Sequence, residues 1–127
     1  MSYHSIFSLK RVSKAFGHSL DGLREAFKLE TAFKQEIIIG SILLIIAILS
    51  PLDLISKAIL IFSSFIVLIT ELLNSAIEWT VNFISPNYHL LAKRIKDIAS
   101  AAVFLSLLQY ILIWIFIFFN HFLGKHG

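Results

Sequence analysis

The chain has 127 residues, of which 57% are hydrophobic and 15% charged, and its formal net charge is +3. This composition excludes an ordinary soluble domain, because the charges are confined to short stretches between long apolar runs. The absence of cysteine excludes disulfides, thiolate zinc sites and thiol catalysis. The length allows one domain, residues 1–127, and three membrane spans with one short extra helix would use nearly all of it.

The first predicted element is an amphipathic helix over about residues 5–29, which we expect to lie on the membrane surface. Its apolar positions recur every three or four residues from Leu9 to Phe27, with basic residues on the other faces. Three membrane-spanning helices are then predicted, and they cover about residues 31–50, 57–84 and 98–123. The sequence therefore predicts an all-α membrane protein with three spans and a surface helix.

The distribution of basic residues predicts the orientation of these spans. Five basic residues precede Lys34, one (Lys57) follows the first span, and Lys93, Arg94 and Lys96 follow the second. The positive-inside rule places the N-terminus and the second loop in the cytoplasm, on one face of the membrane. Topology accounts for the positive charge, and no interleaved basic and aromatic surface indicates a nucleic-acid partner.

Span two carries a polar stripe, because Glu71, Asn74, Ser75 and Glu78 fall within about 100° of one helix face. An acidic residue at the bilayer centre costs about 2.5 to 3.5 kcal/mol, which favours a functional role over structural glue. The two carboxylates are about 10 Å apart along the axis, too far to share one proton or one metal ion within a single helix. We expect Glu78 to meet a divalent cation and nucleotide phosphates near the interface, and Glu71 to act deeper as a general base.

Other polar residues leave alternatives open. Glu30 and Lys34 stand one helical turn apart at the mouth of span one, as a surface ion pair or as part of a metal site. The basic loop with Asp97 is typical of topology charges and could also bind phosphates. Three helices cannot wall off a polar site from lipid, so a homo-oligomer with sites between protomers is expected. No phosphate-binding loop, HExxH or GxSxG motif is present.

The central motif resembles the signature of the prokaryotic diacylglycerol kinase family. It runs Glu71-Leu-Leu-Asn74-Ser75-Ala-Ile-Glu78, then Tyr88-His89, then Ala92-Lys93-Arg94-Ile-Lys96-Asp97-Ile-Ala-Ser100. The segment Glu30-Thr-Ala-Phe33-Lys34-Gln35-Glu36 extends the resemblance upstream over nearly the whole chain. The resemblance implies a homotrimer in the bacterial inner membrane that transfers the γ-phosphoryl group of ATP to diacylglycerol, with Mg²⁺ as the cation.

The same resemblance implies a role for individual residues. Glu71 would be the general base, and Glu30 and Glu78 would hold the divalent cation. The residues expected to contact ATP are Arg11, His18, Glu30, Glu78, His89, Lys96 and Asp97. Those expected to contact the lipid substrate are Arg11, Glu71, Asn74 and Ser100. This chain departs from the family pattern at His18, where an aromatic residue is usual, and at Asn82, where an acid is often found.

Two other functions remain open at this point. The family also contains kinases that phosphorylate undecaprenol, although the segment from Glu30 to Glu36 resembles the diacylglycerol branch more closely. A non-enzymatic membrane subunit, for proton relay or assembly, could use the same glutamates. Lipid phosphorylation separates the kinases from the subunit.

Overall fold

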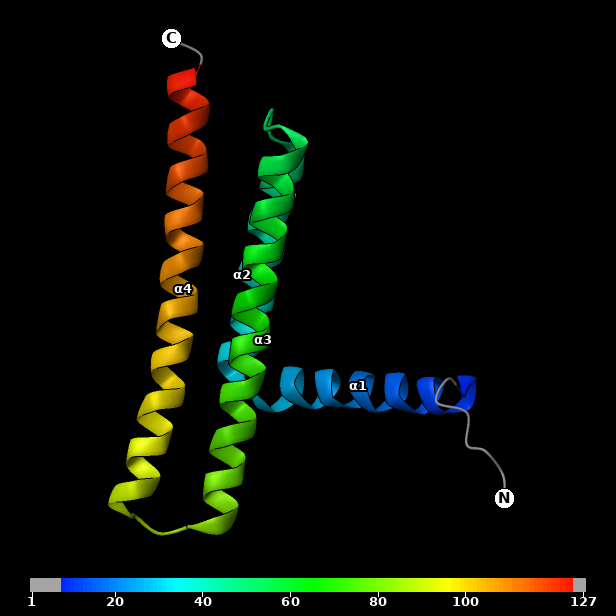
Figure 1. Cartoon of the computed structure of the whole chain (residues 1–127), viewed down its shortest axis with the longest axis vertical. Coiled ribbons are helices and arrows are strands. Elements are labelled where there is room, and N and C mark those ends of the chain that lie inside the picture. Colours follow the sequence, from blue (N-terminus) through cyan, green and yellow to red (C-terminus); the bar gives the residue numbers. More distant parts are fainter. Residues whose placement is uncertain (1–7, 125–127) are drawn as a thin grey trace.

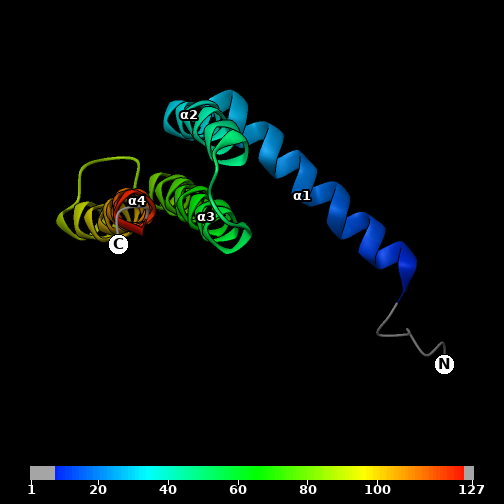
Figure 2. The same ribbon diagram turned by 90° about the horizontal axis from the view of Figure 1, so that it is seen from above.

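The computed structural model describes residues 8–124, and within them the chain is entirely helical apart from short connections. The helices are α1 (Leu9–Leu29), α2 (Thr31–Leu49), α3 (Leu54–Ile84) and α4 (Leu90–Gly124). α1 lies across the direction of the other three (Figure 1), and α3 stands between α2 and α4 when the bundle is seen from above (Figure 2). Residues 5–7 of the predicted surface helix lie outside the described residues.

The prediction of three spans is confirmed, because α2, α3 and α4 are each long and apolar enough to cross a membrane. Most of their large apolar side chains are exposed in the single chain. Such surfaces are stable only against lipid or against another protein, because water would make them aggregate. The protein is therefore a membrane protein, and each apolar helix face has to be covered by lipid or by another protein.

A single residue, Glu30, separates α1 from α2. Its backbone is extended, with φ −105° and ψ 106°, and its N–H donates to the Ala26 carbonyl at 2.9 Å. Glu30 stands at the N-cap of α2 but makes no side-chain capping bond there. The chain therefore turns between the two helices at Glu30, and the side chain of this residue is free for another partner.

α3 begins at Leu54, three residues before the predicted start of span two, because Asp53 caps it. The Asp53 carboxylate accepts hydrogen bonds from the Ser56 hydroxyl at 2.5 Å and the Ser56 N–H at 3.3 Å. These bonds hold the pKa of Asp53 below its ordinary value. Across the same connection the Lys57 ammonium donates to the Ile48 carbonyl at 2.8 Å, which satisfies the C-terminal end of α2.

α4 begins at Leu90, eight residues before the predicted start of span three, which corrects the expectation of a loop from Tyr88 to Asp97. Only residues 85–89 connect the helices. The His89 ring accepts a hydrogen bond from the Leu91 N–H at 3.1 Å, and Lys93 and Asp97 pair at 2.6 Å one turn apart. Both contacts stabilise helix in a segment that its charges made look like a loop.

The lengths of α3 and α4 exceed what a bilayer requires. At about 1.5 Å per residue, their 31 and 35 residues span about 46 and 52 Å, against a hydrocarbon core of about 30 Å. In Figure 1 the connected ends of α3 and α4 extend beyond the level of α1. This pair of helix ends places polar side chains past the level at which α1 joins the bundle.

Two contacts fix the bundle farther from α1. Ala47, Leu52 and Leu60 form a small buried core at the α2–α3 connection, and Trp114 of α4 packs against it. The Gln109 amide donates to the backbone carbonyls of Ser63 at 3.1 Å and Ser106 at 2.9 Å. The two bonds satisfy the amide N–H groups of Gln109 within an apolar span. The bond to Ser63 also links α4 to α3 and helps to hold the two long helices in register.

Candidate active site

Glu71 is the buried centre of the polar stripe on α3, with a side chain only 5% exposed. The carboxyl of Glu36, from α2, lies within hydrogen-bonding reach of the Glu71 carboxyl, and Asn74 adjoins it on α3. The buried Oε2 of Glu36 has no hydrogen-bond donor among the described residues. Two carboxyl groups this close share a proton unless a cation lies between them. The pair is therefore suited to taking up and releasing a proton.

Two more carboxylates lie at the same end of the bundle. Glu78 follows Glu71 by two turns of α3, and Glu30 lies at the corner between α1 and α2. Both are close enough to Glu71 for their charges to act on it. The structure thus brings four acidic side chains from α2, α3 and the α1–α2 corner near one another around Glu71.

The donor set of Glu30 and Glu78 fits a magnesium ion. Mg²⁺ prefers oxygen ligands and usually takes one or two carboxylates, completing its shell with water and substrate phosphates. Within residues 8–124 no three acidic or histidine side chains are placed to hold a metal ion on their own. A cation at this site would therefore need phosphate oxygens or water in addition to the two carboxylates.

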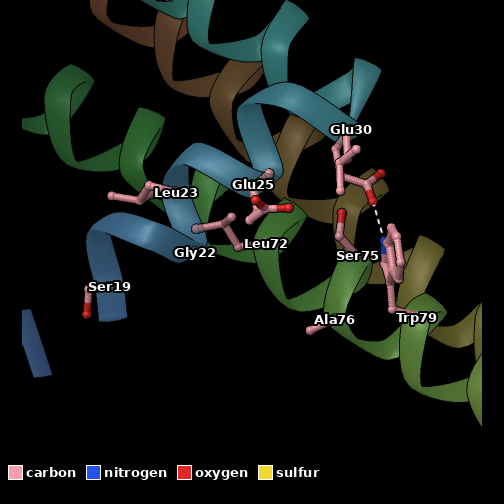
Figure 3. A pocket seen from close by; sticks show the side chains of 11 residues that line it. Ser19, Gly22, Leu23, Glu25, Glu30, Leu72, Ser75, Ala76 and Trp79 are labelled. Carbon is pink, nitrogen blue, oxygen red and sulfur yellow. Dashed lines mark hydrogen bonds between the residues drawn. The ribbon is translucent and has the colours of Figure 1, made fainter. Parts of the chain in front are cut away.

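Glu30 has a different partner from the one that its sequence position suggested. The Trp79 indole N–H, from α3, donates to Glu30 Oε1 at 2.6 Å (Figure 3). Lys34 instead places its ammonium 5.3 Å from the centroid of the Phe27 ring. Within the described residues the ion pairs are Asp21–Arg24 and Lys93–Asp97. The surface ion pair considered for Glu30 and Lys34 is therefore absent from the described part of the chain.

A cleft of about 630 Å³ opens between α1 and α3, next to Glu30 (Figure 3). Its walls are mainly apolar side chains and small residues of the two helices, with Ser75 and Trp79 on the α3 side. Ser75 is buried and belongs to the same stripe as Glu71. Of the four clustered carboxylates only Glu30 lines this cleft, whereas Glu36 lines a separate pocket of about 420 Å³ among mainly apolar side chains of α2, α3 and α4.

A second, polar groove of about 360 Å³ lies where α3 ends and α4 begins. It gathers three of the residues predicted to contact ATP, namely His89, Lys96 and Asp97. The Lys96 ammonium donates to Asn82 Oδ1 at 2.5 Å, which ties the two helices together across the groove. The groove combines positive charge with hydrogen-bonding groups, as phosphate binding requires.

A single chain does not bring together all the predicted site residues. Arg11 and His18 are exposed on α1, 19 and 12 residues before Glu30, which is about 28 and 18 Å along a straight helix. Ser100 is exposed on α4. Sequence reasoning gave no specific role to Glu36 and overlooked Trp79, because both act through partners on other helices. The only local signal was position: Glu36 just inside span one, and an indole beside Glu78.

The fold and the carboxylate cluster define a small helical membrane protein with an acidic site among its helices and a separate groove that carries basic side chains. The model of the family described as prokaryotic diacylglycerol kinase matches residues 17–118. The diacylglycerol kinase of Escherichia coli (strain K12) is 40% identical over 112 residues, which cover 88% of this chain and 92% of that protein. The diacylglycerol kinase of Pseudomonas aeruginosa is 41% identical over 84% of this chain and 86% of that protein. The one of Helicobacter pylori (strain 26695) is 39% identical over 83% of this chain and 82% of that protein. The chain belongs to the prokaryotic diacylglycerol kinase family.

Membership of this family confirms two predictions, the resemblance drawn from the central motif and the assignment to a kinase. The chain is an enzyme of the lipid kinase class, which favours the kinase reading over a non-enzymatic subunit.

Proposed function

We propose that the protein transfers the γ-phosphoryl group of ATP to the free hydroxyl of diacylglycerol and so produces phosphatidic acid. The observation that carries this proposal is the burial of Glu71 beside Glu36, which lines a pocket of about 420 Å³ among mainly apolar side chains of α2, α3 and α4. A hydroxyl that arrives from the membrane meets a carboxylate there, out of bulk water. The names of the relatives favour diacylglycerol as the lipid.

Glu71 acts as the general base. It accepts the proton of the lipid hydroxyl while the hydroxyl oxygen attacks the γ-phosphorus, so that the new O–P bond forms and the bond to ADP breaks. Glu36 provides a second carboxyl in hydrogen-bonding reach, which can receive that proton from Glu71 after the transfer. Asn74 adjoins Glu71 and fixes the orientation of its carboxyl.

Glu30 and Glu78 are the residues that would hold Mg²⁺, and the ion would neutralise charge on the transferred group. Lys96 adds positive charge from the groove between α3 and α4, where His89 and Asp97 also contact the nucleotide. Phosphoryl transfer needs little from a protein beyond such positioning and electrostatic stabilisation. The absence of a phosphate-binding loop is therefore compatible with the reaction.

The remaining site residues come from a second copy in a homotrimer. Arg11 and His18 are too far along α1 to reach Glu30 of their own chain, and Ser100 is exposed on α4. Exposed apolar faces on α2, α3 and α4 offer the surface for such an assembly. In it, Arg11 contacts both ATP and lipid, His18 contacts ATP, and Ser100 contacts the lipid.

The protein lies in the bacterial inner membrane with its N-terminus in the cytoplasm. Positive charge is concentrated on α1 and on the first turns of α4, and Lys57, which follows the first span, is bonded to the end of α2. α1 lies in the membrane surface with its basic residues toward the headgroups. The connected ends of α3 and α4 extend past α1 (Figure 1), and with α1 in the membrane surface this places them in the cytoplasm, where ATP is available.

Phosphorylation of two candidate lipids tests this proposal. The protein in lipid vesicles is given ATP and Mg²⁺ with either diacylglycerol or undecaprenol, and the labelled phosphate in each lipid is measured. We expect phosphate in diacylglycerol. Transfer to undecaprenol alone would overturn the substrate assignment, and transfer to neither lipid by folded protein would overturn the kinase function.

A further inference from the structure

Trp79 makes the one side-chain hydrogen bond that the structure describes to the Glu30 carboxylate, and it comes from a residue 49 positions away in the sequence. The indole is 59% exposed, so its position is not explained by packing into the interior of the chain. Tryptophan has a single donor and no acceptor, which makes a carboxylate oxygen a well-matched partner. The bond connects the corner between α1 and α2 to the turn of α3 that follows Glu78.

Glu30 occupies the N-cap position of α2, but its side chain does not cap the helix. Residues at a helix N-cap usually bind the first free N–H groups with a short polar side chain, whereas Glu30 makes no such bond to α2. Its side chain reaches α3 instead, where Trp79 binds Oε1. Among residues 8–124 no side-chain hydrogen bond to the second oxygen, Oε2, is described, and this oxygen is left for another ligand.

We propose that Trp79 is a positioning residue that binds one oxygen of Glu30 and so presents the other to the cation shared with Glu78. The inference rests on the proposed function, which makes Glu30 and Glu78 the cation ligands. A carboxylate with one oxygen already bonded ligates a cation through a single oxygen, which suits the strict octahedral shell of Mg²⁺. Hydrogen bonds that orient metal ligands typically change metal affinity by about 10- to 100-fold. Because this indole is exposed, we expect the lower end of that range.

The second tryptophan provides a matched control. Trp114 packs against the core at the α2–α3 connection, and its buried N–H has no partner among the described residues. That core includes Leu60, which lies 19 residues before Trp79 on α3 and hence about 28 Å away along the helix. Trp79→Phe and Trp114→Phe therefore each remove one indole, at opposite ends of the bundle.

The first measurement is the Mg²⁺ concentration that gives half-maximal lipid phosphorylation at saturating ATP. In Trp79→Phe we expect it to rise about tenfold with kcat largely kept, and in Trp114→Phe to stay at the wild-type value. A merely structural role would lower the amount of active protein without moving this concentration. An unchanged Mg²⁺ requirement in Trp79→Phe, with a raised one in Glu30→Gln, would overturn the positioning role and leave the proposed function intact.

The second measurement does not depend on turnover. Mn²⁺ with a non-hydrolysable ATP analogue is titrated while tryptophan fluorescence is followed, since a bound paramagnetic ion quenches only a nearby indole. The Trp114→Phe protein, which keeps Trp79, should be quenched, and the Trp79→Phe protein should not. Quenching of Trp79 that persists in a Glu30→Gln, Glu78→Gln double variant would overturn the cation site itself. If the Trp114→Phe protein is not quenched while its phosphorylation still requires the metal, the contact between Trp79 and the site is wrong.

Discussion

Replacement of Glu71 by glutamine tests the general-base assignment most directly. The carboxamide has nearly the same size and can keep a hydrogen bond to Asn74, but it cannot take a proton from the lipid hydroxyl. A positioned general base contributes about 10²- to 10⁴-fold to a rate, or roughly 3 to 5 kcal/mol. Because Glu71 is only 5% exposed, water has little access to replace it. We therefore expect turnover to fall about 10³- to 10⁴-fold.

The assay measures labelled phosphate in diacylglycerol in vesicles at saturating ATP, alongside the binding of an ATP analogue. Binding should stay within about twofold of wild type, because the base contributes little to nucleotide affinity. Thermal stability should not fall, because the substitution removes one of two adjacent buried carboxyls. Glu36→Gln changes the same pair but leaves the base in place, so it should lower turnover much less than Glu71→Gln does. Turnover above about a tenth of wild type in Glu71→Gln would refute the assignment.

Three further perturbations test other parts of the molecule. Glu78→Gln should raise the Mg²⁺ concentration for half-maximal activity by about tenfold or more, and an unchanged Mg²⁺ titration would remove Glu78 from the cation site. Asn82→Asp converts the neutral partner of Lys96 into an anion, which competes with the ATP phosphates for the ammonium. The KM for ATP should therefore rise several-fold with kcat largely kept. Steady-state kinetics that show no change in KM would contradict a phosphate role for Lys96. The lowered pKa of Asp53 stabilises the folded chain above its unfolded pKa, and this contribution is lost as the pH falls through the folded pKa. Asp53→Asn keeps a capping oxygen but carries no charge. Its unfolding temperature in detergent should therefore fall less than that of wild type between about pH 6 and about pH 3. An equal fall in both proteins would argue against the charged cap.

The parts of the fold that follow from local chemistry could be predicted from the sequence. Three apolar runs gave the three spans, because a bilayer requires a fixed length of apolar helix. The start of α4 was placed eight residues late, because its first turns carry Lys93, Arg94, Lys96 and Asp97 and so look like a loop. A helix that extends beyond the bilayer has no apolar signal for its outer turns, and caps and ion pairs decide where it starts.

Without the family resemblance, helical periodicity could predict the candidate site only along one helix. Helical periodicity placed Glu71 and Glu78 on one face of α3 and gave their separation along the axis. The partners of the carboxylates depend on how α2 and the α1–α2 corner pack against α3, and spacing along the chain carries no information about that. The contact of Glu36 with Glu71 and that of Trp79 with Glu30 therefore became visible only in the folded chain.

The corner at Glu30 has a mechanical consequence. α1 has 21 residues and is about 32 Å long, and a single residue joins this rigid arm to the first span. If α1 rests on the bilayer surface, any thinning or bending of the bilayer that tilts the arm turns Glu30 at its pivot, with no loop to absorb the rotation. The carboxylate proposed to bind the cation is thereby coupled to the shape of the membrane whose lipids the enzyme modifies.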